Sequence, residues 1–267
     1  MRSKGLLALA LVLSACPERA QPERGVALTY AKAETAPSEL RAVVDRRLAR
    51  MKLKAHLSED RKALTVRVPN GLDLERIKTV LARPGVLSFC EEDAALSRRV
   101  LCERAWPDGI ELDQAKDSCA LASIDRERLQ REVSALDAGV ELVFEKVDAR
   151  VTGYVKKQGS CFDPHVIGVD VQREPMPSLM VEFDKNATGL FNALTARVVG
   201  AHLLILLDGE VSSAPVVMEP ISGNRAMLTF GRKEDLEVMA AVLAGGPLPG
   251  LTLEKEARYG PPTLSVK

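Results

Sequence analysis

Hydrophobic and polar positions alternate, or recur every three to four residues, along most of the first ninety residues. Alternation predicts strands and helical spacing predicts helices. The strands fall at 25–32, 52–58, 63–69 and 86–90, and the helices at 37–52 and 72–82. This order, strand-helix-strand-strand-helix-strand, is typical of a ferredoxin-like sheet with two helices on one face. Arg41, Arg46, Arg47 and Arg50 form the polar face of the first helix, which is expected to be solvated.

The remaining chain is less regular as far as residue 177. Two helices are predicted at 94–105 and 123–139, the second capped at Ser123, and a strand at 140–149. A loop-rich stretch follows, with glycines and a proline along it. From residue 178 strands and helices alternate again. The predicted strands are 178–183, the two arms of a hairpin within 203–217, 226–230 and 251–257, and the helices are 186–200 and 233–246.

The first residues have the pattern of a bacterial lipoprotein signal. A basic start is followed by an apolar run that ends in Leu13-Ser14-Ala15-Cys16. We therefore predict a signal peptide at 1–15, lipidation of Cys16 and a tether at 16–24, with the lipid as the membrane anchor. Pro17 follows the cysteine where an inner-membrane retention signal would have Asp, which favours the outer membrane. An ordinary secretory signal with a chance cysteine is the alternative.

Export changes how the other cysteines are interpreted. Cys90, Cys102, Cys119 and Cys161 are an even number in an oxidising compartment, which indicates two disulfides with three possible pairings. We favour the local pair Cys102–Cys119 together with Cys90–Cys161. No pair has the CxxC spacing of a zinc site, so no metal site is predicted.

Composition and charge exclude several classes of function. The chain has 37 basic and 37 acidic residues, so no positive excess points to nucleic acid. His56, His165 and His202 are far apart and lie in no metal or nucleophile motif. We predict no catalytic residue, no cofactor and no small-molecule substrate. A hydrolase with an undetected site is an alternative, and it requires clustered carboxylates in a cleft.

Asp208-Gly209 lies between two apolar runs, in the sequence LLILLDGEVSSAPVV. Asp-Gly between such runs is a strong signal for a hairpin turn, because both residues tolerate a positive φ. A catalytic role would require a second carboxylate, a histidine or a nucleophile nearby in the fold. The sequence therefore favours a structural turn.

The stretch from Phe191 to Pro249 closely resembles the first periplasmic domain of SecD, the protein-export membrane subunit. The resemblance rests on an F-x-x-L-T helix, a G-x-x-L-x-I-x-L-D-G-x-V-x-S-A-P hairpin and a helix that ends in G-P-L-P. The central motif residues are Asp208, Gly209, Val211, Ser213, Ala214 and Pro215. A weaker likeness runs through 43–89, so the resemblance covers roughly 25–265.

The resemblance implies an α+β fold of two parts. A ferredoxin-like base is formed by 25–90 and 231–267, and an α+β head by 91–230 is inserted into it. In the family the head is thought to move relative to the base and to hold the emerging polypeptide. Leu190, Phe191 and Leu194 are the candidate polypeptide-binding residues.

The chain departs from the family pattern in three respects. The family's membrane helices have no counterpart, Asn224 follows Gly223 where a Gly pair is usual, and 91–175 matches poorly. We therefore expect a non-catalytic, lipid-anchored periplasmic protein that binds exported polypeptide or an export-machinery protein. The alternative to this role is a scaffold or adaptor that binds one folded partner.

Overall fold

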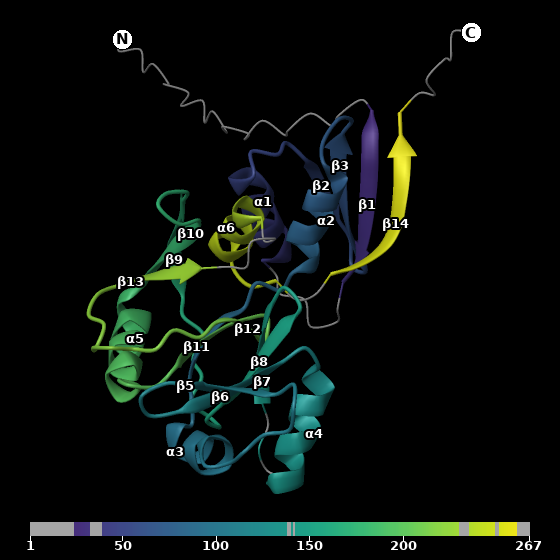
Figure 1. Cartoon of the computed structure of the whole chain (residues 1–267). Coiled ribbons are helices and arrows are strands. Elements are labelled where there is room, and N and C mark those ends of the chain that lie inside the picture. The colour runs from purple at the N-terminus through teal and green to yellow at the C-terminus, as the bar shows by residue number, and fades with distance from the viewer. Residues whose placement is uncertain are drawn as a thin grey trace, which may run out of the picture.

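The computed structural model describes residues 24–32, 39–137, 140, 142–229, 235–248 and 251–260. These residues form a mixed α+β chain with three sheets (Figure 1). The signal peptide, Cys16 and the tether up to residue 23 lie outside the described residues. No helix in the described ranges is long and apolar enough to cross a membrane.

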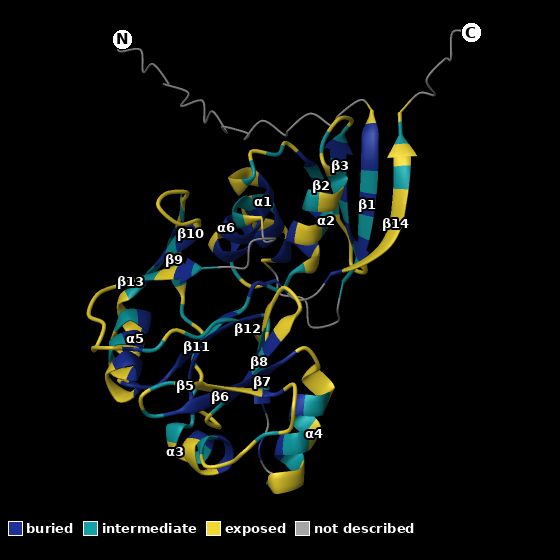
Figure 2. Cartoon of the chain, viewed as in Figure 1, coloured by how far each residue is buried: buried dark blue, intermediate teal, exposed yellow. Residues whose placement is uncertain are grey.

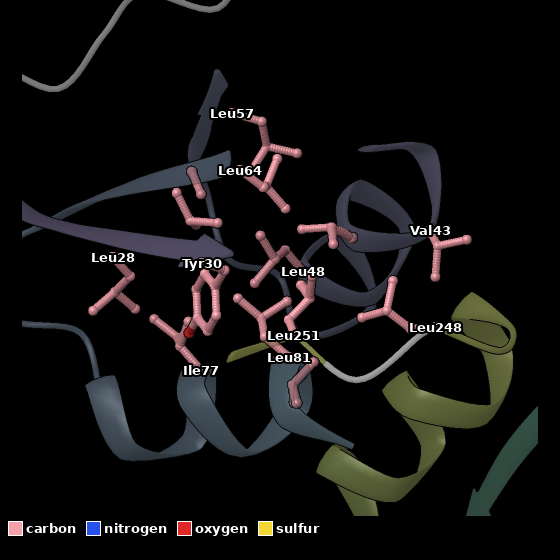
Figure 3. Close-up of a cluster of buried hydrophobic side chains, with 14 of the residues drawn as sticks. Leu28, Tyr30, Val43, Leu48, Leu57, Leu64, Ile77, Leu81, Leu248 and Leu251 are labelled. Atoms are coloured by element: carbon pink, nitrogen blue, oxygen red, sulfur yellow. The ribbon is translucent and has the colours of Figure 1, made fainter. Parts of the chain in front are cut away.

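The first sheet has four antiparallel strands in the order β14-β1-β3-β2. In β1 and β3 buried positions alternate with less buried ones, so one face of these strands is apolar and packs against the helices (Figure 2). Figure 3 shows the resulting core, where Leu28 and Tyr30 of β1 face Ile77 and Leu81 of α2. We call this sheet with α1 and α2 the four-stranded unit. Its elements are β1 (Gly25–Ala31), α1 (Leu40–Arg50), β2 (His56–Glu59), β3 (Ala63–Pro69), α2 (Leu74–Ala82) and β14 (Thr252–Tyr259).

The strand predicted at 86–90 forms as β4 (Leu87–Glu91), but the prediction that it completes the first sheet is wrong. β4 pairs antiparallel with β11 (Leu203–Leu207) in a different sheet. The place beside β1 is taken by β14, from the other end of the chain. Hydrophobic patterning identifies a strand but not its partner, and the strand after α2 belongs to the inserted region.

The second sheet has seven strands in the order β4-β11-β12-β7-β8-β6-β5. α4 (Arg126–Leu136) packs on it through Leu129 and Val133. The side chain of Asp125, and not Ser123 as predicted, caps this helix by accepting from the Arg128 amide. α3 (Ala94–Ser97) and a π-helical turn (Arg98–Cys102) replace the single helix predicted at 94–105. The other strands are β5 (Glu111–Gln114), β6 (Cys119–Ser123), β7 (Leu142–Val147), β8 (Arg150–Val155) and β12 (Glu210–Ser213).

The prediction of a loop-rich stretch before residue 178 is wrong in part, because residues 150–175 contain two strands, β8 and β9 (Val166–Gln172). Gly153 lies within β8, where a Cβ would be 3.0 Å from Leu142 Cδ1 and 3.2 Å from Phe144 Cε1. Glycine is therefore present because the side chains of β7 approach the backbone closely. From the sequence alone, Gly153 was interpreted as part of a loop.

The third sheet has three antiparallel strands in the order β13-β10-β9. α5 (Lys185–Arg197) packs against it, and Phe89 of β4 joins Phe183 and Phe191 in the shared core. We call the seven-stranded and three-stranded sheets, with α3, α4 and α5, the larger unit. α6 (Leu236–Gly245) lies between the two units. The remaining strands are β10 (Ser178–Phe183) and β13 (Arg225–Thr229).

Candidate functional site

Asp208 and Gly209 form the turn that joins β11 to β12. Their φ angles are +56° and +85°. Two positive φ values suit a two-residue hairpin turn, where Asp and Gly are favoured because they tolerate this conformation. The structural interpretation of the Asp-Gly pair therefore agrees with the geometry.

Asp208 also binds a segment far away in the chain. Its Oδ1 accepts hydrogen bonds from the amides of Gly85 at 2.6 Å and Val86 at 2.9 Å. Its own amide donates to the Val86 carbonyl at 2.8 Å. Asp208 and Gly85 are 123 residues apart along the chain, so no local pattern could have indicated this contact. The turn thus holds the crossover that leads from α2 into β4.

Arg47 of α1 holds the same crossover from the other side. Its side chain is fully buried and donates to the carbonyls of Arg83 and Pro84. It also donates to the carbonyls of Val80 and Gly246, both at 2.8 Å. Burial lowers the pKa of Arg47, and the nearby negative charge of Asp208 offsets part of this effect. The resulting pKa is about 10. Arg47 is therefore still a cation at neutral pH, solvated by carbonyl oxygens instead of water.

The prediction of a solvated arginine face on α1 is wrong for one of its four residues, the buried Arg47, whereas Arg46 and Arg50 are exposed. These two exposed residues also make hydrogen bonds: Arg46 donates to the Gly245 carbonyl at 3.0 Å and Arg50 to the Val169 carbonyl at 2.7 Å. The helix pattern shows which side is polar, but it cannot show that one arginine of that side is buried against carbonyl oxygens. Arg41 is exposed.

The other motif residues hold the hairpin in place. Val211 is buried in a small cluster that also contains Cys90 and Tyr154, and Ser213 pairs with Ile205 across the hairpin. The Pro215 carbonyl accepts from the Leu203 amide at 2.9 Å. Ala214 is half-buried.

Phe191 and Leu194 do not lie on an open binding face, so that prediction is wrong. Each is 1% exposed and belongs to the core around Phe89 and Phe183. The Phe191 ring lies 5.0 Å from the Phe89 ring, measured between centroids. The helical stripe that suggested a binding face is the stripe that α5 buries. Leu190, at 48% exposed, lies outside that core.

Other apolar side chains of the larger unit are exposed, in contrast to Phe191 and Leu194. Met218 is 81% exposed, Val199 41% and Ile221 39%. Val199 forms a β-bridge with Val217, and Thr195 of α5 hydrogen-bonds both the amide and the carbonyl of Ile221. Figure 1 shows the chain between β12 and β13 running beside α5. We call Val199, Met218 and Ile221 the exposed apolar surface. Only the three-dimensional structure reveals it.

His202, Ser118 and Glu92 form a buried polar cluster in the larger unit. His202 Nδ1 lies 2.7 Å from Glu92 Oε2, and the His202 amide donates to the same oxygen at 3.0 Å. Ser118 Oγ also donates to Glu92 Oε2. The second carboxylate oxygen, Oε1, is buried without a protein partner. The sequence could not bring these three residues together, because they come from three separate segments.

This cluster does not have the geometry of a catalytic triad. In a triad the hydroxyl bonds to the imidazole nitrogen opposite the one that bonds the carboxylate. Here Ser118 Oγ lies 3.2 Å from His202 Nδ1, the nitrogen that also faces Glu92. Ser118 is 1% exposed. The described residues contain no group of three or more His, Cys, Asp or Glu side chains suited to a metal.

Two disulfides lie in the larger unit. Cys90 of β4 is joined to Cys161, and Cys102 of the π-helical turn to Cys119 of β6. These are the two pairs favoured from the sequence. The Cys90–Cys161 disulfide links β4 of the seven-stranded sheet to the loop before β9. The Cys102–Cys119 disulfide links the π-helical turn to β6 of the same sheet. Both therefore stabilise the region that matches the SecD pattern poorly.

The comparisons with known proteins agree with this architecture. Residues 143–250 match the family described as SecDF, P1 head subdomain. Over 89 residues the chain is 41% identical to the protein translocase subunit SecD of Acidaminococcus fermentans, covering 33% of this chain and 21% of that protein. The predicted resemblance to SecD is confirmed. The SecD of Desulfurispirillum indicum is 28% identical over 209 residues, covering 76% of this chain and 36% of that protein.

Solved SecDF structures share the fold. The crystal structure of SecDF in its super-membrane-facing form has a TM-score of 0.56 at 18% identity, and the match covers 91% of this chain and 32% of that one. A second structure, described as a membrane component SecDF that enhances protein export, has a TM-score of 0.50 at 19% identity. That match covers 87% of this chain and 98% of the solved chain. The matched regions span between a fifth and two fifths of the length of the two curated SecD proteins named above.

Proposed function

We propose that this chain takes part in protein export on the periplasmic side of a bacterial membrane, where it binds unfolded exported polypeptide or an export-machinery protein. The observation that carries the proposal is the match of 143–250 to the SecDF P1 head, together with relatives that are translocase subunits. We propose binding without catalysis, because the buried Ser118, His202 and Glu92 lack a triad's geometry.

The proposal includes a division into base and head. The four-stranded unit, with strand order β14-β1-β3-β2, is the ferredoxin-like base, and the larger unit is the head. The base ends at the crossover Arg83–Val86 and not at residue 90, because β4 belongs to the second sheet.

The proposed binding surface is the exposed apolar surface together with the edge of β13. Met218 and Ile221 lie just before β13, which is the edge strand of the three-stranded sheet. An extended polypeptide can add to a sheet edge through backbone hydrogen bonds, which makes recognition largely independent of sequence. Apolar side chains beside the edge would hold the apolar residues that unfolded chains expose.

Lipidation of Cys16 is part of the proposal, with outer-membrane attachment favoured. Gly25 at the start of β1 pairs with Tyr259 at the end of β14, at the end of the sheet that lies away from the larger unit (Figure 1). A tether that enters at Gly25 would therefore hold the base near the membrane. The head with Met218 would then extend away from it.

Photo-crosslinking in cells tests the function. A photoreactive amino acid replaces Met218, and the captured species are identified by mass spectrometry. The matched control position is Leu253 of β14, which is 38% exposed and lies on the other unit. Many unrelated exported chains, or translocon subunits, captured from 218 and not from 253 support the proposal. One dominant folded partner would indicate an adaptor instead, and no adducts beyond those of the control would contradict both roles.

A further inference from the structure

We propose that the Cys90–Cys161 disulfide is a redox switch, which a dithiol protein opens through Cys161 and which then releases the segment 157–163 from the edge of β4. We call this segment the strap. The inference does not depend on the proposed function. It rests on the backbone groups of β4 that the strap occupies, and on the different exposure of the cysteines.

The strap covers one edge of the seven-stranded sheet. β4 is the terminal strand of that sheet and pairs with β11 along its other edge. Along the covered edge, Phe89 and Phe162 exchange two backbone hydrogen bonds of 3.0 Å each. The Lys157 amide donates to the Glu91 carbonyl at 3.0 Å, and the Glu91 amide donates to Ser160 Oγ at 3.1 Å. In an edge strand alternate residues point their backbone groups outward, and here the strap occupies those of Phe89 and Glu91.

Little apolar burial holds the strap in place. Phe162 is its only large apolar side chain and is half-buried. Two polar side-chain contacts add to the backbone bonds: Lys157 Nζ lies 2.7 Å from Glu91 Oε2, and Ser88 Oγ donates to Asp163 Oδ1 at 2.5 Å. Lys157 and Asp163 are both exposed. Segments with few buried apolar contacts and exposed hydrogen bonds open at low free energy, so the covalent link contributes much of the strap's attachment.

The two disulfides differ in how a thiol can reach them. Cys161 is exposed, although its partner Cys90 is 0% exposed. In the other pair Cys102 is half-buried and Cys119 is 0% exposed. A thiolate must contact the sulfur that it attacks, so the rate of exchange depends on access to that sulfur. Attack is therefore directed to Cys161, and the Cys102–Cys119 disulfide is better protected.

Two thiol–disulfide exchanges open the switch. A thiolate of the dithiol protein attacks Cys161 Sγ, so the bond to Cys90 Sγ breaks and a mixed disulfide forms at Cys161. Cys90 leaves as a thiolate and takes a proton from water. The second thiolate of the dithiol protein then attacks its own partner sulfur and releases Cys161, which is protonated in the same way. The dithiol protein leaves as a disulfide, so two electrons pass to this chain and both cysteines become thiols.

Reduction uncovers the edge of β4. The strap's remaining covalent connections are those to β8 before it and to β9 after it. As the strap moves away, the amides and carbonyls of Phe89 and Glu91 lose their partners. An uncovered strand edge is a template for pairing with another extended chain. The disulfide therefore controls whether the seven-stranded sheet presents this edge.

Reduction of the folded full chain by reduced thioredoxin tests the exchange site. Samples taken at intervals are quenched with acid, unfolded and alkylated, and mass spectrometry locates the new thiols. Cys90 and Cys161 should appear as thiols about tenfold faster or more than Cys102 and Cys119, because a thiol reaches their disulfide more easily. Equal rates for the two disulfides, or earlier reduction of Cys102–Cys119, would overturn the inference.

Hydrogen exchange of the chain reduced at Cys90–Cys161 tests the release of the strap. Peptides that contain the Phe89, Lys157 and Phe162 amides should exchange about tenfold faster or more than in the oxidised chain, while β6, β7 and β8 keep their protection. A Cys90→Ala, Cys161→Ala variant should match the reduced chain, and the control Cys102→Ala, Cys119→Ala should keep the strap protected.

Two exchange results would overturn the release. The first is unchanged exchange of the strap after reduction. The second is a loss of protection throughout the seven-stranded sheet, because the disulfide would then hold the fold of the larger unit and not the strap alone. Reduction of the unsubstituted chain decides between these results even where a variant unfolds.

Discussion

Arg47 and Asp208 bind opposite sides of the same four-residue segment, one through its carbonyls and the other through its amides. The Asp-Gly turn is therefore both a hairpin turn and a long-range contact. This pairing joins the sequence's most recognisable motif to a helix at the other end of the chain, and it suggests why an acidic residue occupies the turn.

Asp208→Ala should destabilise the protein by about 2–3 kcal/mol, because two amides lose their acceptor and alanine disfavours positive φ. Asp208→Asn keeps an acceptor oxygen and tolerates the turn, so its cost should be about 1 kcal/mol or less. Urea unfolding measures both values. The control is Glu210→Ala, at an exposed side chain of the same turn, which should have almost no effect. Equal losses for Ala and Asn would contradict the acceptor role.

Removal of the Cys90–Cys161 disulfide should cost more than removal of Cys102–Cys119. The two pairs close loops with sequence separations of 71 and 17 residues. Loop-closure entropy predicts a difference of about 1 kcal/mol in favour of the longer loop. Paired Cys→Ala variants compared by urea unfolding measure this difference, and non-reducing mass spectrometry of the unsubstituted chain checks the pairing. Any other pairing would refute the basis of this prediction.

Phe191→Ala should destabilise the protein by about 3–5 kcal/mol, the usual cost of removing a buried phenylalanine. The matched control is Leu190→Ala on the same helix, which should cost far less because Leu190 is 48% exposed. Thermal or urea unfolding distinguishes the two variants. Similar small effects from both substitutions would mean that Phe191 is not in the core.

Glu91 should make the stability of the larger unit depend on acid pH. Burial raises its pKa, but hydrogen bonds from Lys157 and Arg197 outweigh burial and lower the pKa overall. A carboxyl with a lower pKa in the folded state stabilises it above the ordinary Glu pKa, about 4.3, and this contribution is lost as pH falls through the folded value.

Glu91→Gln should therefore cost about 1.5 kcal/mol at pH 7, the low end for hydrogen bonds to a charged group, since Lys157 and Arg197 are half exposed. The difference from the unsubstituted chain should shrink as the pH falls below 4, in unfolding curves recorded from pH 7 to pH 3. A constant difference across that range would show that the charge of Glu91 is not responsible.

Local patterns predicted the elements of the four-stranded unit well, because most of them bury one periodic stripe. Leu28 and Tyr30 alternate in β1, and Val44 and Leu48 recur at helical spacing in α1. The partner of β4 could not be predicted, since pairing is decided by residues more than a hundred positions away. β8 was missed because Gly153 resembles a loop signal when its close neighbours are unknown.

The residues of the candidate site and of the proposed binding surface were harder to predict than the fold. An apolar stripe that binds a partner and one that packs in the core have the same helical spacing. Phe191 of α5 was therefore predicted to bind polypeptide, although it lies in the core. Arg47 had no signal at all, because a buried arginine and a solvated one are identical in sequence. Met218 was missed for a related reason: exposure of a single apolar residue depends on the path of its loop.

The binding of an unfolded exported polypeptide to the purified full chain tests the central claim most directly. Fluorescence anisotropy of a labelled secretory protein, kept unfolded by reduction and carboxymethylation, measures the affinity. The proposed function predicts saturable binding that a Met218→Glu, Ile221→Glu variant weakens by about tenfold or more, while Leu253→Glu leaves it unchanged. No binding by the folded chain, or equal binding by the two variants, would contradict the claim.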